Sequence, residues 1–334
     1  TLRLQQREDG VRIDQVVLSP STYLATSPGT TKRDTTILPP NDGVLPNGSE
    51  FKVATWNIRS GDGRCPISGS CPFVDSTQNC TDPGQPLNAW GVGIPQSALS
   101  VVNEDSTLIA LALQEAWACG QPTNVKNVLR WAYASTAYNG TALLTRYGIR
   151  GTLESKLVSA PTDEPAYILG ADVCLDLTCA ATLRVYVVHL TFFSLDDHVV
   201  DTVVLAQTQT MLAWIATQPH ADRHVVVGDF NAFEREPAID FRCELAFDYR
   251  TPQAMRSAGY TDAWLAVHGS APGMTATLNR NGCGVTNGGP WKRIDYAYLK
   301  GLTPASSSFF AFESANTAAA SDHYGLIASF SGSE

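Results

Sequence analysis

The chain has 334 residues, of which 44% are hydrophobic and 16% are charged. This balance excludes a disordered chain, a coiled coil and a collagen-like protein, and it provides enough apolar residues for a globular core. The formal net charge of −9 comes from 23 Lys and Arg against 32 Asp and Glu, which argues against a protein that binds nucleic acid through a broad basic face.

The first fifty residues form two segments of different character. The segment 1–27 begins with alternating apolar and polar residues on both sides of Glu8-Asp9-Gly10, a pattern typical of a β-hairpin. The segment 28–50 is rich in Pro, Gly, Thr and Asn, which is typical of a linker. We therefore expect the main domain at 51–334.

The main domain contains a succession of strand and helix patterns. Apolar runs predict strands at 51–56, 108–114, 142–145, 183–189, 224–228, 294–299 and 324–330. Helical periodicity occurs at 95–103, 125–133 and 202–217. Because the two kinds of element do not alternate strictly, the sequence favours an α/β (α+β) domain of two packed sheets with outer helices over a Rossmann fold.

The eight cysteines are an even number without a Cys-x-x-Cys pair, which favours disulfides over a zinc ribbon, with free buried thiols as the alternative. Cys174 and Cys179 flank a four-residue turn and are the simplest local pair. A second pair is expected among Cys65, Cys71 and Cys80. Together with the low charge density, these cysteines predict a secreted protein, extracellular or periplasmic. No apolar run approaches the length of a membrane span, and no obligate protein partner is implied.

Polar clusters stand at one end of six predicted strands. The clusters are Trp56-Asn57, Gln114-Glu115, Val188-His189, Gly228-Asp229-Phe230-Asn231, Arg293-Ile294-Asp295-Tyr296 and Ser321-Asp322-His323. One such carboxylate or histidine is usually a turn, cap or surface residue. Six of them supply oxygen ligands and imidazoles, which suit a Mg²⁺-type site that also transfers protons. No Gly-rich phosphate loop or Gly-x-Ser-x-Gly elbow competes with this interpretation.

In their order along the chain, these motifs resemble the endonuclease/exonuclease/phosphatase superfamily, the deoxyribonuclease I-like fold, from about residue 51 to residue 330. The resemblance implies a four-layer sandwich of two packed mixed β-sheets flanked by helices, with the site at one edge of the paired sheets. It also implies a metal-dependent phosphoric ester hydrolase. Separately, residues 7–19 resemble the closing strands of a carbohydrate-binding jelly-roll module, so 1–27 is either the end of such a module or a hairpin packed on the main domain.

The resemblance implies metal ligands and a substrate contact at particular positions. Glu115 would be the main carboxylate ligand, with Asn57 beside it and Asp322 completing the site. Mg²⁺ is the expected cofactor, with Mn²⁺ or Ca²⁺ as alternatives. Arg146 stands where family members often carry a residue that touches phosphate, and an ordinary surface arginine is the alternative.

The resemblance also implies a catalytic set. Asp229 and Asn231 would face the attacking water and the phosphate. His323, held by Asp295, would order or deprotonate that water, and His189 would donate a hydrogen bond or a proton to the phosphoryl group. The sequence therefore predicts a phosphodiesterase that works by in-line attack of an activated water.

The substrate stays open among several classes. We expect a nuclease-like enzyme, for which Arg59, Arg64, Arg146 and Arg150 would line a groove. A sphingomyelinase-like or phospholipase C-like enzyme for lipid head groups is the main alternative, and it needs exposed aromatics, for which the candidates are Phe192-Phe193 and Phe309-Phe310 with Phe312. A metabolite phosphatase and a non-catalytic carbohydrate-binding protein are the remaining hypotheses.

Overall fold

The computed structural model describes residues 50–58, 105, 107–116, 121–136, 140–158, 166–191, 196–234, 248–271, 273–276, 292–310, 321 and 323–332. The predicted hairpin at 1–27, almost all of the linker at 28–50, the predicted helix at 95–103 and Asp322 lie outside this part of the chain. No helix in the described part is both long and apolar enough to cross a bilayer.

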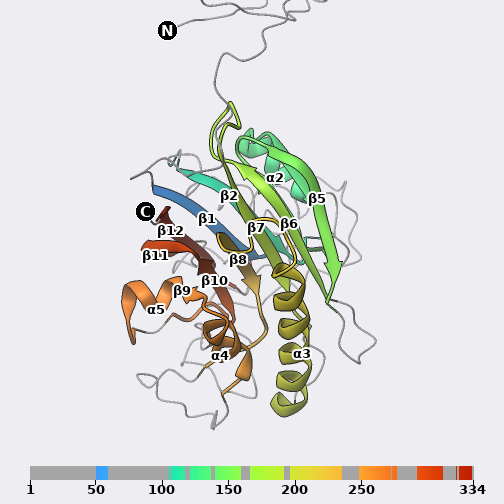
Figure 1. Ribbon diagram of the computed structural model, residues 1–334, viewed down its shortest axis with the longest axis vertical. Helices are drawn as coiled ribbons and strands as arrows, with labels where there is room; N and C mark the ends of the chain where they lie inside the picture. Colours follow the sequence, from blue (N-terminus) through green and yellow to red (C-terminus); the bar gives the residue numbers. More distant parts are fainter. Residues whose placement is uncertain are drawn as a thin grey trace, which may run out of the picture. The chain divides into compact units, whose positions relative to one another are not determined.

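Twelve strands of the described residues form two six-stranded sheets (Figure 1). The first sheet has the spatial order β11 (Leu302–Phe310), β12 (Gly325–Gly332), β1 (Glu50–Asn57), β2 (Leu108–Gln114), β4 (Ala142–Thr145) and β3 (Tyr133–Thr136). The second has the order β5 (Ile149–Leu157), β6 (Tyr167–Cys174), β7 (Thr182–His189), β8 (His224–Asp229), β10 (Asp295–Lys300) and β9 (Thr261–Asp262).

Both sheets are mixed in strand direction. In the first sheet β1 is parallel to β2, and in the second β7 is parallel to β8, whereas the other neighbouring pairs are antiparallel. Parallel neighbours end at the same edge of a sheet, so each sheet brings two strand ends together at one edge.

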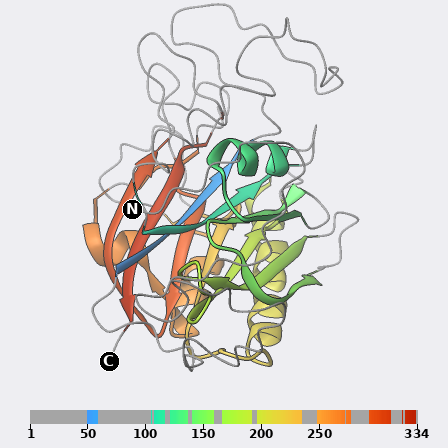
Figure 2. The ribbon, with the colours of Figure 1, turned by 90° about the horizontal axis from the view of Figure 1, so that it is seen from above.

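The two sheets pack face to face, and helices cover their outer faces. Successive residues of a strand point to opposite faces, so Val53 and Val187 join the core between the sheets. Trp56 belongs to an outer cluster with α2 (Gln121–Leu129), and Tyr186 belongs to another with α3 (Asp197–Ile215) and α4 (Arg250–Ser257). The result is the expected four-layer deoxyribonuclease I-like sandwich, which Figure 2 shows from a second direction.

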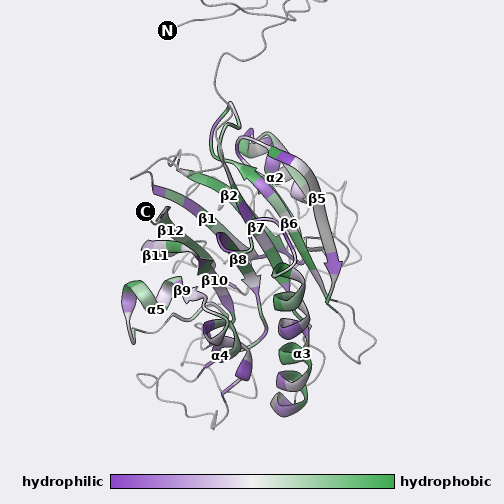
Figure 3. Ribbon diagram, in the orientation of Figure 1, coloured by the Kyte–Doolittle hydropathy of each residue, from purple (hydrophilic) through white to green (hydrophobic). Residues whose placement is uncertain are grey.

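The helix α3 (Asp197–Ile215) forms because its sequence supplies both a cap and an apolar face. The Asp196 carboxylate accepts hydrogen bonds from the backbone N–H groups of His198 and Val199. Its buried residues Val204 and Met211 pack against the outer face of the second sheet. Figure 3 shows hydrophobic and hydrophilic residues alternating along this helix. The shorter helices are α4 (Arg250–Ser257) and α5 (Ala263–His268).

The seven predicted strands are all present, with ends that differ by at most two residues. The helix predicted at 125–133 instead occupies Gln121–Leu129. Its end is set by Arg130, whose φ of 57° leaves the helical region, after which the chain enters β3 at Tyr133. The Cys174–Cys179 disulfide is present as predicted, and the other six cysteines lie outside the described residues.

Candidate active site

The strand ends of both sheets bring the predicted polar residues to one edge. β1 ends at Asn57, and the parallel strand β2 leads directly into Glu115. In the second sheet, β7 and β8 end at His189 and Asp229, which are direct neighbours in the parallel register. The antiparallel strand β10 begins at Asp295, which pairs with Asp229.

His323 lies two residues before the first residue of β12. Because β12 runs antiparallel to β1, its start lies at the edge of the sheet where β1 ends, and His323 reaches the same edge. Two hydrogen bonds connect Ser321 and His323 to β1, and a third joins these two residues. The Trp56 indole donates to the carbonyl of His323 at 3.1 Å. The Ser321 hydroxyl donates to the carbonyl of Asn57 at 2.6 Å and accepts from the backbone N–H of His323 at 3.1 Å. The end of β1 therefore fixes the position of the imidazole.

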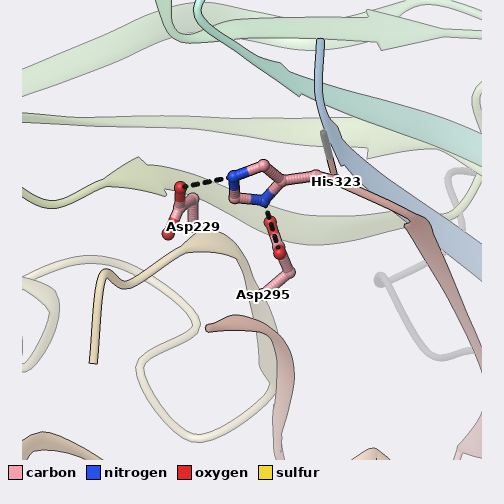
Figure 4. Close-up of side chains that lie close together, drawn as sticks. All are labelled: Asp229, Asp295 and His323. Carbon is pink, nitrogen blue, oxygen red and sulfur yellow. Dashed lines mark hydrogen bonds and ion pairs between the residues drawn. The ribbon is translucent and has the colours of Figure 1, made fainter. Parts of the chain in front are cut away.

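The imidazole of His323 lies between two buried carboxylates (Figure 4). Its Nδ1 is 2.8 Å from Asp295 Oδ2, a hydrogen bond, and its Nε2 is 3.9 Å from Asp229 Oδ2. One possible ligand atom from each of the three side chains lies within 4.8 Å of the others. This is the geometry of a histidine oriented by one carboxylate and facing another.

Asn57 extends the cluster towards Glu115 and His189. Its side-chain Nδ2 donates to Glu115 Oε1 and to Asp229 Oδ2, both at 3.0 Å. Nε2 of His189 is 3.9 Å from Glu115 Oε1 and 3.8 Å from Asp229 Oδ2. The structure therefore brings these residues together with Asp295 and His323 around Asp229.

The electrostatic environment of Asp229 is unusual. Burial raises the pKa of this carboxyl group, and the negative charge of Asp295 raises it further. The imidazoles of His323 and His189, and a 2.8 Å hydrogen bond from the backbone N–H of Asn231, act in the opposite direction. The net effect is a pKa above the ordinary value for aspartate.

Gly228 allows β7 and β8 to lie close enough that His189 and Asp229 are neighbours. Its φ is 143°, and a Cβ at this position would lie 2.0 Å from the carbonyl oxygen of Val188. Only glycine allows this approach. The next residues of the two strands, His189 and Asp229, are then held side by side.

The residues of the cluster fit a divalent cation. Asp229 and Asp295 are both buried, and no described Lys or Arg forms an ion pair with either of them. Asp295 Oδ1 is buried and has no hydrogen-bond partner among the described residues. With Glu115 included, three carboxylates lie near the two imidazoles of His323 and His189, so the negative charge exceeds what the imidazoles can balance. Glu115 adds a partly exposed carboxylate of the kind that Mg²⁺ binds.

Two other predicted residues have different positions. Asn231 is buried beside the cluster, and its side-chain amide donates to the carbonyl of Leu190 at 2.7 Å. Arg146 is not brought to the cluster. Its guanidinium donates to the carbonyl of Leu108 at 2.8 Å, at the first residue of β2, whereas Glu115 follows the last. Because β4 runs antiparallel to β2, the chain leaves β4 at the opposite end of the sheet.

The structure also contains a cavity of about 620 Å³ between α4 and α5. It shares none of its lining residues with the cluster. Arg293 lines it and forms a 2.7 Å ion pair with Asp262, and Glu234 is bound by Arg256. The sequence motifs, rather than this cavity, therefore locate the candidate site.

Sequence reasoning missed two hydroxyl groups that support the cluster. Ser321 lies within a recognised motif, but its bonds to the end of β1 depend on which strand lies alongside. Thr275 Oγ1 accepts from the backbone N–H groups of Ile294 and Asp295, each at 3.2 Å. Thr275 belongs to none of the six motifs, and no local signal marks it.

Comparison with known proteins agrees with this fold. The profile of the Endonuclease/Exonuclease/phosphatase family matches residues 54–323. No curated protein matches the sequence significantly.

Among solved structures, the endonuclease/exonuclease/phosphatase from Beutenbergia cavernae has a TM-score of 0.57 and 14% identity, covering 84% of this chain and 71% of that chain. The family protein from Bacteroides thetaiotaomicron has a TM-score of 0.56 and 13% identity, covering 84% and 95%. Humanized D. rerio TDP2 has a TM-score of 0.53 and 16% identity, covering 84% and 99%. At these identities the similarity shows a shared fold.

Proposed function

The chain belongs to the endonuclease/exonuclease/phosphatase family, whose members are generally metal-dependent phosphoesterases, and on this premise we propose that it is a divalent-metal-dependent phosphodiesterase. One observation carries the proposal. His323 is held by Asp295 and faces Asp229, at the edge where the two sheets also present Glu115 and His189.

The His323–Asp295 hydrogen bond supports a role in activating water. An ionised carboxylate only accepts hydrogen bonds, so Nδ1 carries the hydrogen in this arrangement and Nε2 is the basic nitrogen. In the proposed reaction, the oxygen of a water molecule bonds to phosphorus and a proton of that water passes to Nε2. The bond from phosphorus to the leaving oxygen breaks in line, and the leaving oxygen takes the electron pair of that bond. Asp229, close to Nε2, stabilises the imidazolium that forms.

His189 and Asn231 complete the proposed catalytic set from the other side of Asp229. His189 Nε2 lies 3.9 Å from Glu115 Oε1 and 3.8 Å from Asp229 Oδ2. In the proposed reaction the His189 imidazole donates a hydrogen bond to the phosphoryl group as negative charge develops there. The backbone N–H of Asn231 keeps the Asp229 carboxylate oriented.

Glu115 and Asn57 are the proposed protein ligands of the cation, together with Asp322, which lies outside the described residues. We favour Mg²⁺, with Mn²⁺ or Ca²⁺ as alternatives, because the donors are hard oxygens. When bound, the cation supplies positive charge to a nonbridging phosphate oxygen. The side-chain nitrogen of Asn57 also donates hydrogen bonds to both Glu115 and Asp229, and so holds these two carboxylates close together.

For the substrate we favour a nuclease-like diester over a lipid head group. A lipid enzyme of the kind considered above needs exposed aromatics, but Phe310 is buried and Phe309 stacks on Trp264 with ring centroids 4.2 Å apart. The other candidates, Phe192-Phe193 and Phe312, lie outside the described residues. A lipid phosphodiesterase and a metabolite phosphatase remain the alternatives that the substrate panel below distinguishes. The Cys174–Cys179 disulfide supports a protein that works outside the reducing cytosol.

The proposal is tested with bis(p-nitrophenyl) phosphate in the presence of Mg²⁺ or Mn²⁺. We expect release of nitrophenol that EDTA abolishes and that Asp295→Asn strongly reduces. No turnover with any divalent cation would instead favour the non-catalytic carbohydrate-binding hypothesis. A panel of supercoiled DNA, RNA, sphingomyelin and phosphoinositides then separates the substrate classes. Faster cleavage of sphingomyelin than of either nucleic acid would contradict the nuclease-like assignment.

A further inference from the structure

A short segment at 273–276 joins the two polypeptide stretches that carry Asp295 and His323. Ala276 forms antiparallel bridges to Lys292 on one side and to His323 on the other. The backbone N–H groups of Thr275 and Ala276 both donate to the carbonyl of Lys292 at 3.0 Å. This segment therefore lies between the start of β10, in one sheet, and the residues that precede β12, in the other.

Within this segment Thr275 makes contacts to both sides with different atoms. Its hydroxyl oxygen accepts from the backbone N–H groups of Ile294 and Asp295, each at 3.2 Å. Its carbonyl oxygen accepts from the backbone N–H of Tyr324 at 2.7 Å. Thr275 is fully buried, so water does not replace these bonds.

The Thr275 hydroxyl accepts the backbone hydrogen bonds that a neighbouring strand would otherwise accept at the start of β10. β9 pairs with β10 only at Tyr298 and Leu299, so among the described residues no strand covers the start of β10 on that side. The N–H of Asp295 would be an unsatisfied buried donor without the Thr275 oxygen. Gly273 permits the close passage of this segment, because a Cβ there would lie 2.6 Å from the Trp264 indole nitrogen and 2.7 Å from Arg293 Cδ.

We propose that Thr275 is a positioning residue that sets the contact between the Asp295 carboxylate and the His323 imidazole. Its hydroxyl fixes the backbone that carries the carboxylate, and its carbonyl fixes the backbone next to the imidazole. The 2.8 Å hydrogen bond between Nδ1 of His323 and Oδ2 of Asp295 depends on both. The effect on turnover rests on the proposed phosphodiesterase function, whereas the effect on this hydrogen bond does not.

The test uses Thr275→Val, which keeps the shape and removes the hydroxyl, and Thr275→Ser, which restores it. Thr208→Val is the matched control, because Thr208 is equally buried and its hydroxyl donates to the carbonyl of Val204 within α3. Proton NMR of histidine-labelled protein follows the low-field Nδ1–H signal of His323, which is assigned by its absence in His323→Ala.

We expect Thr275→Val to weaken or shift this signal upfield, while Thr275→Ser and Thr208→Val keep it. With bis(p-nitrophenyl) phosphate, kcat of Thr275→Val falls by about 10–100-fold with little change in KM, and Thr275→Ser recovers most of the loss. A folded Thr275→Val protein that keeps both the signal and kcat overturns the proposal. If the wild-type protein turns over no diester, the NMR comparison still decides the role of Thr275.

If Thr275→Val does not fold, hydrogen exchange of the wild-type protein decides the matter. The amides of Ile294 and Asp295 are expected to exchange as slowly as those in the middle of β10. Rapid exchange at both amides would show that the hydroxyl does not hold them, and this result would also overturn the proposal.

Discussion

The side-chain amide of Asn57, at the end of β1, donates a 3.0 Å hydrogen bond to the carboxylate of Asp229, at the end of β8. These strands belong to different sheets, so one buried hydrogen bond joins the two sheets at the candidate site. The residues that meet there come from positions 57 to 323 of the chain, and the packing of the sheets is what brings them together.

Asn57→Leu should destabilise the protein and abolish most activity. The substitution removes a donor from the buried Asp229 carboxylate, a loss worth about 1–3 kcal/mol of unfolding free energy. Urea unfolding measures the stability, and bis(p-nitrophenyl) phosphate measures the activity. Asn127→Leu, on the exposed side of α2, is the control and should change neither quantity. Unchanged stability in Asn57→Leu would show that the cross-sheet bond contributes little.

Glu115→Gln should weaken the metal dependence without unfolding the protein. Glutamine can still accept the hydrogen bond from Asn57 but lacks the charge that a divalent cation requires. The Mn²⁺ concentration for half-maximal binding, followed by electron paramagnetic resonance, should rise by about tenfold or more. Glu234→Gln removes a carboxylate of similar exposure that is bound by Arg256, and it should leave Mn²⁺ binding unchanged. A drop in melting temperature with intact Mn²⁺ binding would assign Glu115 a structural role.

His323→Ala and His189→Ala should each lower kcat by about 10²–10⁴, the range for groups that transfer protons. Both substitutions remove an imidazole next to Asp229. Steady-state kinetics on folded protein, verified by circular dichroism, measure the effect. His198→Ala, on the exposed surface of α3, should retain the wild-type rate. A near-wild-type rate in either site variant rules out the role assigned to that histidine.

His224 should make the fold sensitive to acid. Burial lowers the pKa of this imidazole to about 4, against the smaller opposing effect of its hydrogen bond with the His220 carbonyl. An unfolded histidine has a pKa of about 6.5. Between these values the unfolded chain binds a proton that the folded protein does not. The contribution of His224 to the unfolding free energy is therefore fully present above about pH 6.5 and is lost as the pH drops towards 4.

The loss attributable to His224 is on the order of 3 kcal/mol across that range. Urea unfolding at several pH values measures it, and His224→Phe should flatten the dependence by this amount whatever its stability at pH 7.5. His198→Phe, at an exposed site, should keep the wild-type slope. An equal slope in wild type and His224→Phe would contradict the assignment.

The disulfide prediction is tested by counting thiols. The native protein, denatured without reductant, should show few reactive sulfhydryls out of eight cysteines, because Cys174 and Cys179 are joined and the proposed oxidising compartment would favour further pairs. Titration with a thiol reagent before and after reduction gives the number. Eight reactive thiols before reduction would place the protein in a reducing compartment.

The central strands were predictable because they are continuous apolar runs buried on both faces. Strands of both sheets that lack such a run were missed. β6 contains Gly170, which weakens a strand pattern, yet a Cβ there would lie 2.6 Å from the ring of Tyr186. The glycine is therefore required by a partner in β7, which periodicity within β6 cannot indicate. β11 carries three consecutive serines and Pro304, which also hide its strand character.

The candidate site was predictable to the extent that its residues follow or precede core strands. Asn57, Glu115, His189, Asp229 and His323 all do so, and the structure gathers them at one edge.

Arg146 could not be placed from sequence, because its position depends on the direction of β4 relative to β2. Thr275 was missed because its partners lie about twenty residues later in the chain, and only the folded structure brings them into contact.

Because Asp229 is bonded to Asn57 of the other sheet, the rate of turnover should depend on how tightly the two sheets pack against each other. Each sheet can keep its own hydrogen-bond ladder while the interface between the sheets loosens, and the ladder is what circular dichroism detects. On gradual heating, turnover should therefore disappear at a lower temperature than the β-sheet signal. A shift of a fraction of an ångström between the sheets separates Asn57 from the Asp229 carboxylate before any strand unfolds.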